Sequence, residues 1–231
     1  MELSSFLQAA RDGNLNKVKE LHLKGEDIDQ VSKNGSSALI YASENGHIHI
    51  IQYLIDNGAN PALQTKMGGT ALNRAAESGN LEIMKFLLDN GTPIGDLALI
   101  VAAREGYYEA VVMLVKSGAN INAQQRWGQT ALMLAAREGH NSIVKFLLDS
   151  GANVRLRDRN GDTALNIALD NDNPDIVMQL RRAGAKAQTR KKVVPVENED
   201  DEDDDSSSSV DELISDDSDL PPDDVEIEDD I

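Results

Sequence analysis

Two histidines separated by one residue, His47 and His49, have the type and spacing that could hold a metal ion. A structural zinc site needs four ligands and a catalytic site needs three, yet no third candidate lies nearby in the sequence. The stretch "DRNGD" at 158–162 loosely resembles a calcium loop, but its twelfth position, where a bidentate glutamate is required, is Leu169. We therefore expect a hairpin at 158–162, and no metal or other cofactor.

The motifs of common catalytic sites are missing from the sequence. It contains no G-x-x-x-x-G-K-[ST] phosphate loop, no H-E-x-x-H pair and no G-x-S-x-G nucleophile turn. The absence of cysteine excludes disulfides and thiolate metal sites. These observations predict a protein that is not an enzyme.

The single tryptophan, Trp127, lies in the polar stretch "QQRWGQT" at 124–130, between Arg126 and Gly128. Tryptophan and arginine are the residue types most enriched among binding hot spots. One interpretation makes Trp127 an anchor for a partner, and the other packs it against a neighbouring loop. The sequence leaves both interpretations open.

Two series of glycines reveal an internal repeat, which must position these residues. One series follows alanine-rich segments, and the other ends apolar segments. Both have spacings of 33 residues, except for one spacing of 27 at the same place in the chain. The first series is Gly13, Gly46, Gly79, Gly106 and Gly139, and the second is Gly25, Gly58, Gly91, Gly118, Gly151 and Gly184. A shared period with a shared six-residue deletion indicates six structural units.

The pattern within a unit predicts two short helices and a turn. In the fifth unit Thr130 is a good helix N-cap, and Gly139 lets the chain reverse at left-handed φ. The apolar residues after Gly139 follow a helical spacing. Since no unit can bury this stripe alone, the units must stack. Small side chains allow their close approach, at Ala42, Ala75, Ala102, Ala135 and Ala168.

The repeated segments resemble the ankyrin repeat. Its T-P-L-H-x-A-A signature corresponds to "SALIYAS" (37–43), "TALNRAA" (70–76), "LALIVAA" (97–103), "TALMLAA" (130–136) and "TALNIAL" (163–169), with alanine at the proline position. This resemblance implies an all-α solenoid of six helix-turn-helix units with hairpin fingers over residues 1–192. The expected units are 2–33, 34–66, 67–93, 94–126, 127–159 and 160–190.

The resemblance also implies a concave binding surface made of the fingertips and the exposed positions of each first helix. The residues expected there are Tyr41, Arg74, Arg104, Arg126, Trp127, Arg137, Arg155, Arg157 and Arg159. The six missing residues shorten the loop at 91–99 and remove a finger beside Trp127. Asn122 in "GANINA", with Leu114 eight residues before it, resembles the target of asparaginyl hydroxylases in ankyrin repeats.

The charge of the chain is divided unevenly along its length. Residues 193–231 hold 19 of the 40 acidic residues and no lysine or arginine, which predicts a disordered polyanionic tail. Within this tail Ser208 and Ser209 resemble sites of acidophilic kinases. Residues 126–192 carry a net charge of +5, so we expect the tail to contact these basic fingers. Nucleic acid is not an expected partner, because the tail would compete with phosphate.

The sequence as a whole predicts a protein-interaction module that acts by occupying its partner, with the acidic tail modulating binding. Two alternatives remain: a tail-driven binder of basic proteins, similar to a histone chaperone or a nucleic-acid mimic, and a secreted effector or adaptor of a pathogen or symbiont. We expect a monomer in the cytoplasm or nucleus. The N-terminal residues do not resemble a signal peptide, and no apolar run is long enough to cross a membrane.

Overall fold

The computed structural model describes residues 3–186, and its regular structure in that range is helical, with one isolated bridge between Val31 and Ser37. Twelve helices in this range form six pairs: α1 (Ser5–Arg11) with α2 (Leu15–Leu23), α3 (Ala38–Glu44) with α4 (Ile48–Asp56), α5 (Ala71–Glu77) with α6 (Leu81–Asp89), α7 (Asp96–Glu105) with α8 (Tyr108–Lys116), α9 (Ala131–Glu138) with α10 (Asn141–Asp149), and α11 (Ala164–Asp170) with α12 (Pro174–Arg182). The predicted all-α fold is confirmed. The predicted tail at 193–231, with Ser208 and Ser209, lies outside the described residues.

Hydroxyl side chains fix the start of the first helix in most repeats. Ser37, Thr70, Thr130 and Thr163 each accept a hydrogen bond from the backbone N–H three residues later, at 3.1–3.3 Å. Such a cap stabilises a helix by about 1 kcal/mol. Helix α7 instead begins after Gly95, which offers no side-chain cap. Its first turn carries Asp96, a carboxylate that complements the helix dipole.

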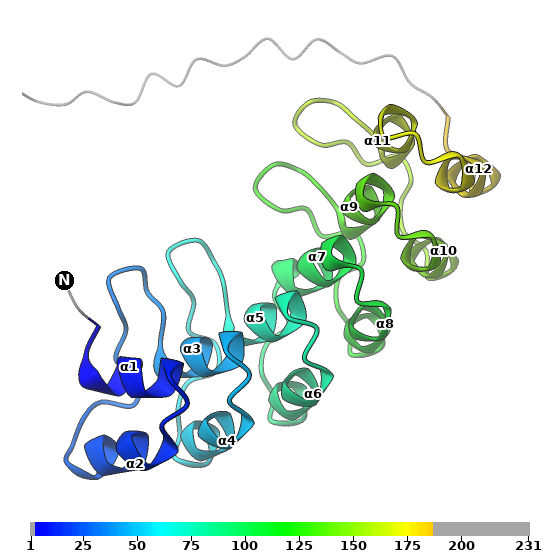
Figure 1. Cartoon of the computed structure of the whole chain (residues 1–231). Coiled ribbons are helices and arrows are strands. Elements are labelled where there is room, and N and C mark those ends of the chain that lie inside the picture. The colour runs from blue at the N-terminus through cyan, green and yellow to red at the C-terminus, as the bar shows by residue number, and fades with distance from the viewer. Residues whose placement is uncertain (1–2, 187–231) are drawn as a thin grey trace, which may run out of the picture. The chain divides into compact units, whose positions relative to one another are not determined.

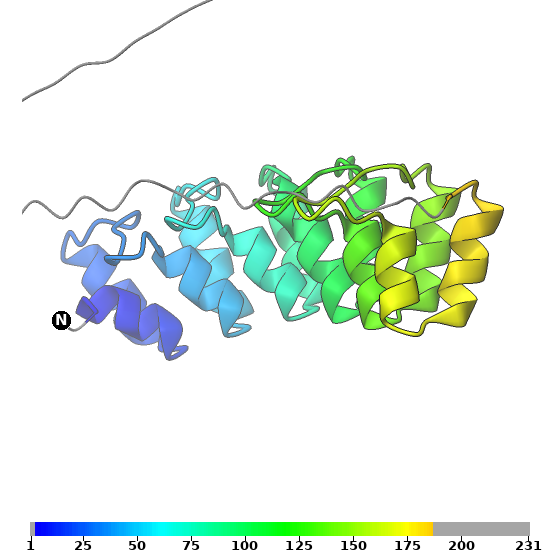
Figure 2. The same cartoon turned by 90° about the horizontal axis from the view of Figure 1, so that it is seen from above.

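The helix pairs stack in chain order and form two rows (Figures 1 and 2). Odd-numbered helices contact one another in one row, and even-numbered helices contact one another in the second. The alanines at the five periodic positions are fully buried, as are leucines of the second helices: Leu54, Leu87, Leu114, Leu147 and Leu180. Burying one such leucine stabilises the fold by about 2 kcal/mol. The core is therefore continuous through the stack.

Long loops project from the row of odd-numbered helices as fingers (Figure 1). Finger 1 spans 24–37, finger 2 spans 57–70, finger 4 spans 117–130 and finger 5 spans 150–163. Between α6 and α7 there are only residues 90–95, so the third finger is missing. The helices on either side of this short loop still stack, α5 against α7 and α6 against α8. The deletion therefore removes a finger without interrupting the core.

In the first and fourth repeats, the glycine between the two helices is required by a histidine ring of the next repeat. Gly106 has φ +85°, and a Cβ there would lie 2.6 Å from Cε1 of His140. The His140 ring donates a hydrogen bond of 2.9 Å from Nε2 to the carbonyl oxygen of Arg104. Gly13 and His47 repeat this arrangement, with His47 Nε2 at 3.0 Å from the Arg11 carbonyl oxygen. At these two interfaces the histidine ring of one repeat therefore binds the backbone of the repeat before it.

Asp172 occupies the same register position in the last repeat, 33 residues after Gly139. It has φ +51° and is the one non-glycine residue with positive φ in the described part of the chain. No further helix pair stacks on this position within residues 3–186, so its Cβ meets no ring from a following repeat. The backbone strain at Asp172 is therefore tolerated, whereas the same side chain at Gly106 would displace His140.

We predict opposite effects for Gly106→Ala and Asp172→Gly. The left-handed conformation costs alanine about 1–2 kcal/mol, and the collision with His140 adds to this, so Gly106→Ala should lower stability by at least that amount. Asp172→Gly should raise stability by about 0.5–1 kcal/mol, because relief of strain exceeds the entropy cost of glycine. Urea denaturation of each variant measures both effects. A neutral Gly106→Ala would show that the ring contact does not fix the stack.

Candidate protein-binding surface

The four fingers associate in two pairs through their backbones. The N–H of Lys66 in finger 2 donates to the carbonyl of Asn34 in finger 1, at 2.9 Å. The N–H of Arg159 in finger 5 donates to the carbonyl of Trp127 in finger 4, at 3.0 Å. Gly35 permits the first approach and Gly128 the second, since a Cβ at either position would lie 3.1 Å from backbone atoms of the next finger.

A groove separates the two finger pairs where the third finger is missing, and we call it the notch. It has a volume of about 760 Å³. Residues of finger 2 form one wall, residues of finger 4 form the other, and the short loop before α7 forms the floor. The lining includes Gln64, Met67, Ile94, Leu97, Gln124, Arg126 and Trp127.

The Trp127 side chain lines the notch and is 59% exposed. The guanidinium carbon of Arg126 lies 5.9 Å from the ring centroid, and that of Arg159 lies 5.6 Å from it. Each cation–π contact at an exposed site contributes about 0.5–1 kcal/mol. Trp127 thus contacts the neighbouring finger through Arg159 while its ring stays accessible. Its role as an anchor for a partner remains a prediction.

The other arginines of finger 5 differ in accessibility. Arg155 is exposed, whereas Arg157 is half-buried and donates a hydrogen bond to the Gly161 carbonyl. The carboxylate of Asp158 accepts hydrogen bonds from the backbone N–H groups of Asn160 and Asp162, both at 2.9 Å. Residues 158–162 therefore form the expected hairpin, and the Asp158 carboxylate oxygen Oδ1 is already occupied by the backbone.

The arginines of the first helices form ion pairs with neighbouring carboxylates. Glu77 accepts from Arg74 at 2.8 Å and from Arg104 at 3.1 Å, and Arg104 also pairs with Glu105 at 2.7 Å. Hydrogen bonding to Glu105 raises the pKa of the Arg104 guanidinium, and the charges of Glu105 and Glu77 act in the same direction against partial burial. Arg137 pairs with Glu138 at 2.9 Å. These cations are therefore paired with carboxylates of their own or the adjacent first helix.

Tyr41 and Asn122 have structural contacts of their own. Tyr41 is half-buried, and its hydroxyl donates to the Ser32 hydroxyl at 3.3 Å, which ties α3 to finger 1. The side-chain oxygen of Asn122 accepts a hydrogen bond from the N–H of Asn153 at 2.8 Å, which joins the bases of fingers 4 and 5. Hydroxylation of Asn122 remains a prediction.

His47 and His49 do not converge on a site. The His47 ring lies against Gly13 and binds the Arg11 carbonyl, whereas His49 contacts the amide oxygen of Gln52 at 3.4 Å. Within residues 3–186 no group of three or more histidine and carboxylate side chains is placed to hold a metal ion. No helix in the same range is both long enough and apolar enough to cross a membrane.

Met67 is not among the residues expected at the binding surface, yet it is 76% exposed at the tip of finger 2. A pattern that could have revealed it is the register of the repeat. Once the six-residue deletion is counted, Met67 aligns with Trp127, and Lys66 aligns with Arg126. The two walls of the notch therefore present equivalent positions of two different fingers.

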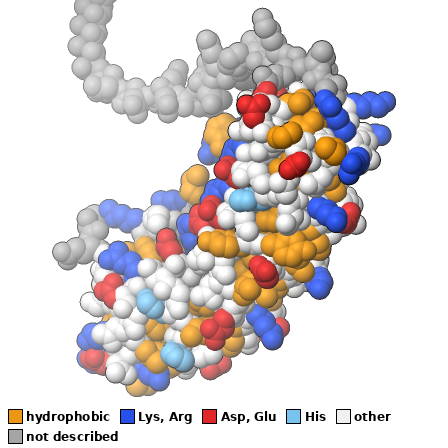
Figure 3. Space-filling model, turned by 45° about the vertical axis from the view of Figure 1, so that its right-hand side comes forward, with side chains coloured by type: hydrophobic (Ala, Val, Ile, Leu, Met, Phe, Trp, Pro, Cys, Tyr) orange, Lys and Arg blue, Asp and Glu red, His pale blue; other side chains and the backbone are white. Residues whose placement is uncertain are grey.

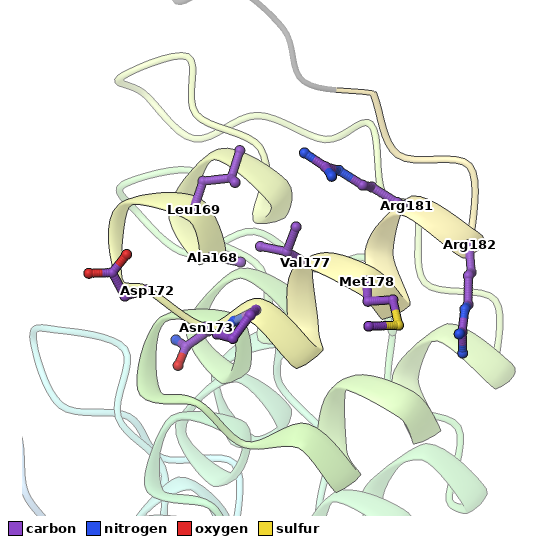
Figure 4. A pocket seen from close by; sticks show the side chains of 9 residues that line it. Ala168, Leu169, Asp172, Asn173, Val177, Met178, Arg181 and Arg182 are labelled. Atoms are coloured by element: carbon purple, nitrogen blue, oxygen red, sulfur yellow. The ribbon is translucent and has the colours of Figure 1, made fainter.

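A second groove lies between α11 and α12 on the outer face of the last repeat (Figure 4). It has a volume of about 770 Å³, and its lining includes Leu169, Val177, Met178, Arg181 and Arg182. In the earlier repeats the corresponding face is covered by the next helix pair, which accounts for its apolar lining.

Figure 3 shows Lys and Arg side chains gathered near these C-terminal repeats, at the upper right of the view.

The comparisons with known proteins agree on one family. The sequence model "Ankyrin repeats (3 copies)" matches residues 6–98 and again 99–191. An ankyrin repeat domain from Acinetobacter baumannii is 31% identical with a TM-score of 0.68, over 78% of this chain and 98% of that one. The human ASB11 ankyrin repeat domain is 28% identical with a TM-score of 0.71, over 81% and 87%. No curated protein sequence matches with significance.

A further similar chain belongs to the complex of a predatory endopeptidase from Bdellovibrio bacteriovorus with an immunity protein. It is 28% identical with a TM-score of 0.68, over 79% of this chain and 99% of that one.

The stacked helix pairs and projecting fingers define a helical repeat protein of the interaction class. The chain belongs to the ankyrin-repeat family, whose domains bind other proteins and are generally not enzymes.

We predict that Trp127→Ala leaves folding nearly intact. Truncating a buried tryptophan costs about 3–5 kcal/mol, but Trp127 would lose mainly two exposed cation–π contacts, so the expected cost is below about 2 kcal/mol. Chemical denaturation of the variant and of the parent chain measures the difference. A loss of unfolding free energy as large as that caused by truncating a core residue would mean that Trp127 stabilises the finger pair and does not serve as an anchor for a partner.

Proposed function

We propose that the repeat domain binds a protein partner through the fingertips beside the notch and the adjoining face of the first helices, and that it acts by occupying the partner's surface. The observation that carries this proposal is the exposed Trp127 ring between two guanidinium groups. Its backbone is already bonded to finger 5. An anchor positioned in this way loses little conformational freedom on binding.

The charge distribution favours an acidic partner surface. Arg126 and Arg159 are exposed at the fingertips and Arg155 is exposed lower on finger 5, whereas the helix-face cations are paired with carboxylates: Arg74, Arg104 and Arg137. Arg157 contributes its charge to the same finger. Complementary charge of this kind mainly raises the association rate and selects among partners.

One similar chain comes from a complex of an endopeptidase with an immunity protein. That complex supports the idea that a chain of this fold takes part in a specific complex with another protein. The alternative in which the acidic segment 193–231 is the main binding element concerns residues outside the described part of the chain, and it predicts capture that does not depend on the fingers.

Affinity capture from the source organism, followed by mass spectrometry, tests the proposal with three forms of the full chain. Trp127→Ala alters the fingertip, and Lys145→Ala serves as control because Lys145 is exposed on α10, away from the fingers. A partner of the fingertips should be retained by the parent chain and by Lys145→Ala, and reduced about tenfold or more by Trp127→Ala, since hot-spot truncations cost 2 kcal/mol or more. Equal capture by all three forms would contradict the proposal.

A further inference from the structure

Two backbone groups at the notch lack the partner that their equivalents have elsewhere. In each finger pair, the carbonyl at the tip of one finger accepts from an N–H of the next finger. By the repeat spacing, Met67 occupies the position of Asn34, whose carbonyl accepts the bond. Arg126 occupies the position of Lys66, whose N–H donates it. Neither the Met67 carbonyl nor the Arg126 N–H bonds to another residue within the described range. Both groups therefore occupy the positions that would pair with the missing finger.

The interior of the notch also contains a buried acceptor without a partner. Asn73 is 6% exposed and lines the notch, and its amide nitrogen donates to the Gly68 carbonyl at 3.3 Å. Its side-chain oxygen has no hydrogen-bond partner. Leaving such a buried group unsatisfied costs about 1–3 kcal/mol.

Finger 2 leaves room for a chain that takes the place of the missing finger. A Cβ at Gly35 or Gly128 would meet the backbone of the following finger at 3.1 Å. At the equivalent Gly68 the nearest atom is Cδ1 of Leu97, 3.8 Å away, and it belongs to the floor of the notch. The backbone surface of finger 2 that faces the notch is therefore uncovered.

The charges around the notch are mainly positive. Arg126 lines the notch, Lys66 is exposed and precedes the lining residue Met67, and Arg159 contacts the Trp127 ring. None of these three cations makes an ion pair with a described residue. The one acidic residue in the lining is Asp96, on the floor. The apolar side chains Met67 and Trp127 flank the opening.

We propose that the notch binds a hairpin loop of a partner protein, which takes the place of the third finger. The loop would accept from the Arg126 N–H, donate to the Met67 carbonyl, and place an apolar residue between Met67 and Trp127, with carboxylates beside Lys66 and Arg126. This inference rests on the proposed function and specifies the chemistry of the partner. A hairpin fits better than a helix, because a hairpin edge offers unpaired N–H and C=O groups whereas helix interiors do not.

Synthetic hairpins provide the probe for this site. One backbone-cyclised hairpin carries a leucine between two aspartates in its turn, and the control carries two lysines in their place. Binding to the full chain is followed by the fluorescence of Trp127, the only tryptophan in the sequence, and by calorimetry. The acidic hairpin should bind at least about tenfold more tightly than the control, which corresponds to about 1.4 kcal/mol.

Restoring the third finger should close the site. Replacing residues 92–97 with a copy of residues 59–70 adds the six missing residues and introduces no tryptophan. The restored finger should pair with fingers 2 and 4, leave the denaturation midpoint unchanged or higher, and weaken binding of the acidic hairpin by at least about tenfold.

A backbone variant gives an independent test that does not depend on the graft. Arg126 is the second residue of a turn closed by the Gly128 N–H on the Gln125 carbonyl, a position that suits proline. Arg126→Pro removes charge and N–H, whereas Arg126→Ala removes the charge alone. The proline variant should bind the acidic hairpin about fivefold more weakly than the alanine variant, the effect of one net hydrogen bond.

Several results would overturn the inference. These are no binding of the acidic hairpin, equal binding by the finger-restored chain, and equal affinity of the two Arg126 variants. Self-association that the restored finger abolishes would make the occupant a second copy of the chain, and binding of a peptide of residues 193–231 at this site in place of the hairpin would make it the acidic segment. If Trp127-dependent partner capture persists in any of these cases, the proposed function stands and only the notch assignment fails.

Discussion

The stacking of one helix pair on the next is the interaction on which the rest of the structure depends. No pair can cover its own apolar stripe, so the leucines of the second helices and the alanines of the first are buried only because a neighbour lies on each side. Between the fourth and fifth repeats, the His140 ring also packs against Gly106 and bonds to the Arg104 carbonyl. Because the helices carry this interaction, a finger can be lost between repeats three and four while the stack continues.

The fingers contribute little to the core, and they differ in what they leave available to a partner. Within each finger pair, a backbone hydrogen bond and a close glycine contact cover the facing edges. At the missing finger the same edges face a groove, so a deletion that the core tolerates produces a surface with unpaired backbone groups and two exposed apolar side chains. The loss of a structural element thus creates a groove between the finger pairs.

The distribution of charge separates the helix face from the fingertips. Arg74, Arg104 and Arg137 are held by carboxylates on their own or the adjacent helix, and these exposed pairs are worth at most about 1 kcal/mol each. Lys66, Arg126 and Arg159 have no such partner among the described residues. At the fingertips an acidic ligand therefore does not compete with carboxylates of the protein itself for these cations. The attraction between ligand and cation acts within a Debye length of about 8 Å at physiological salt.

The sequence by itself determined the six-fold repeat, the all-α fold and the position of the missing finger, because these follow from glycine spacing and apolar periodicity, both of which are local along the chain. It also placed Trp127 at a fingertip. Only the tertiary structure decided that the ring is exposed while its carbonyl binds Arg159, and that Met67 forms the opposite wall of the notch. Those facts depend on how fingers distant in sequence pair across the stack, and no single repeat encodes that pairing.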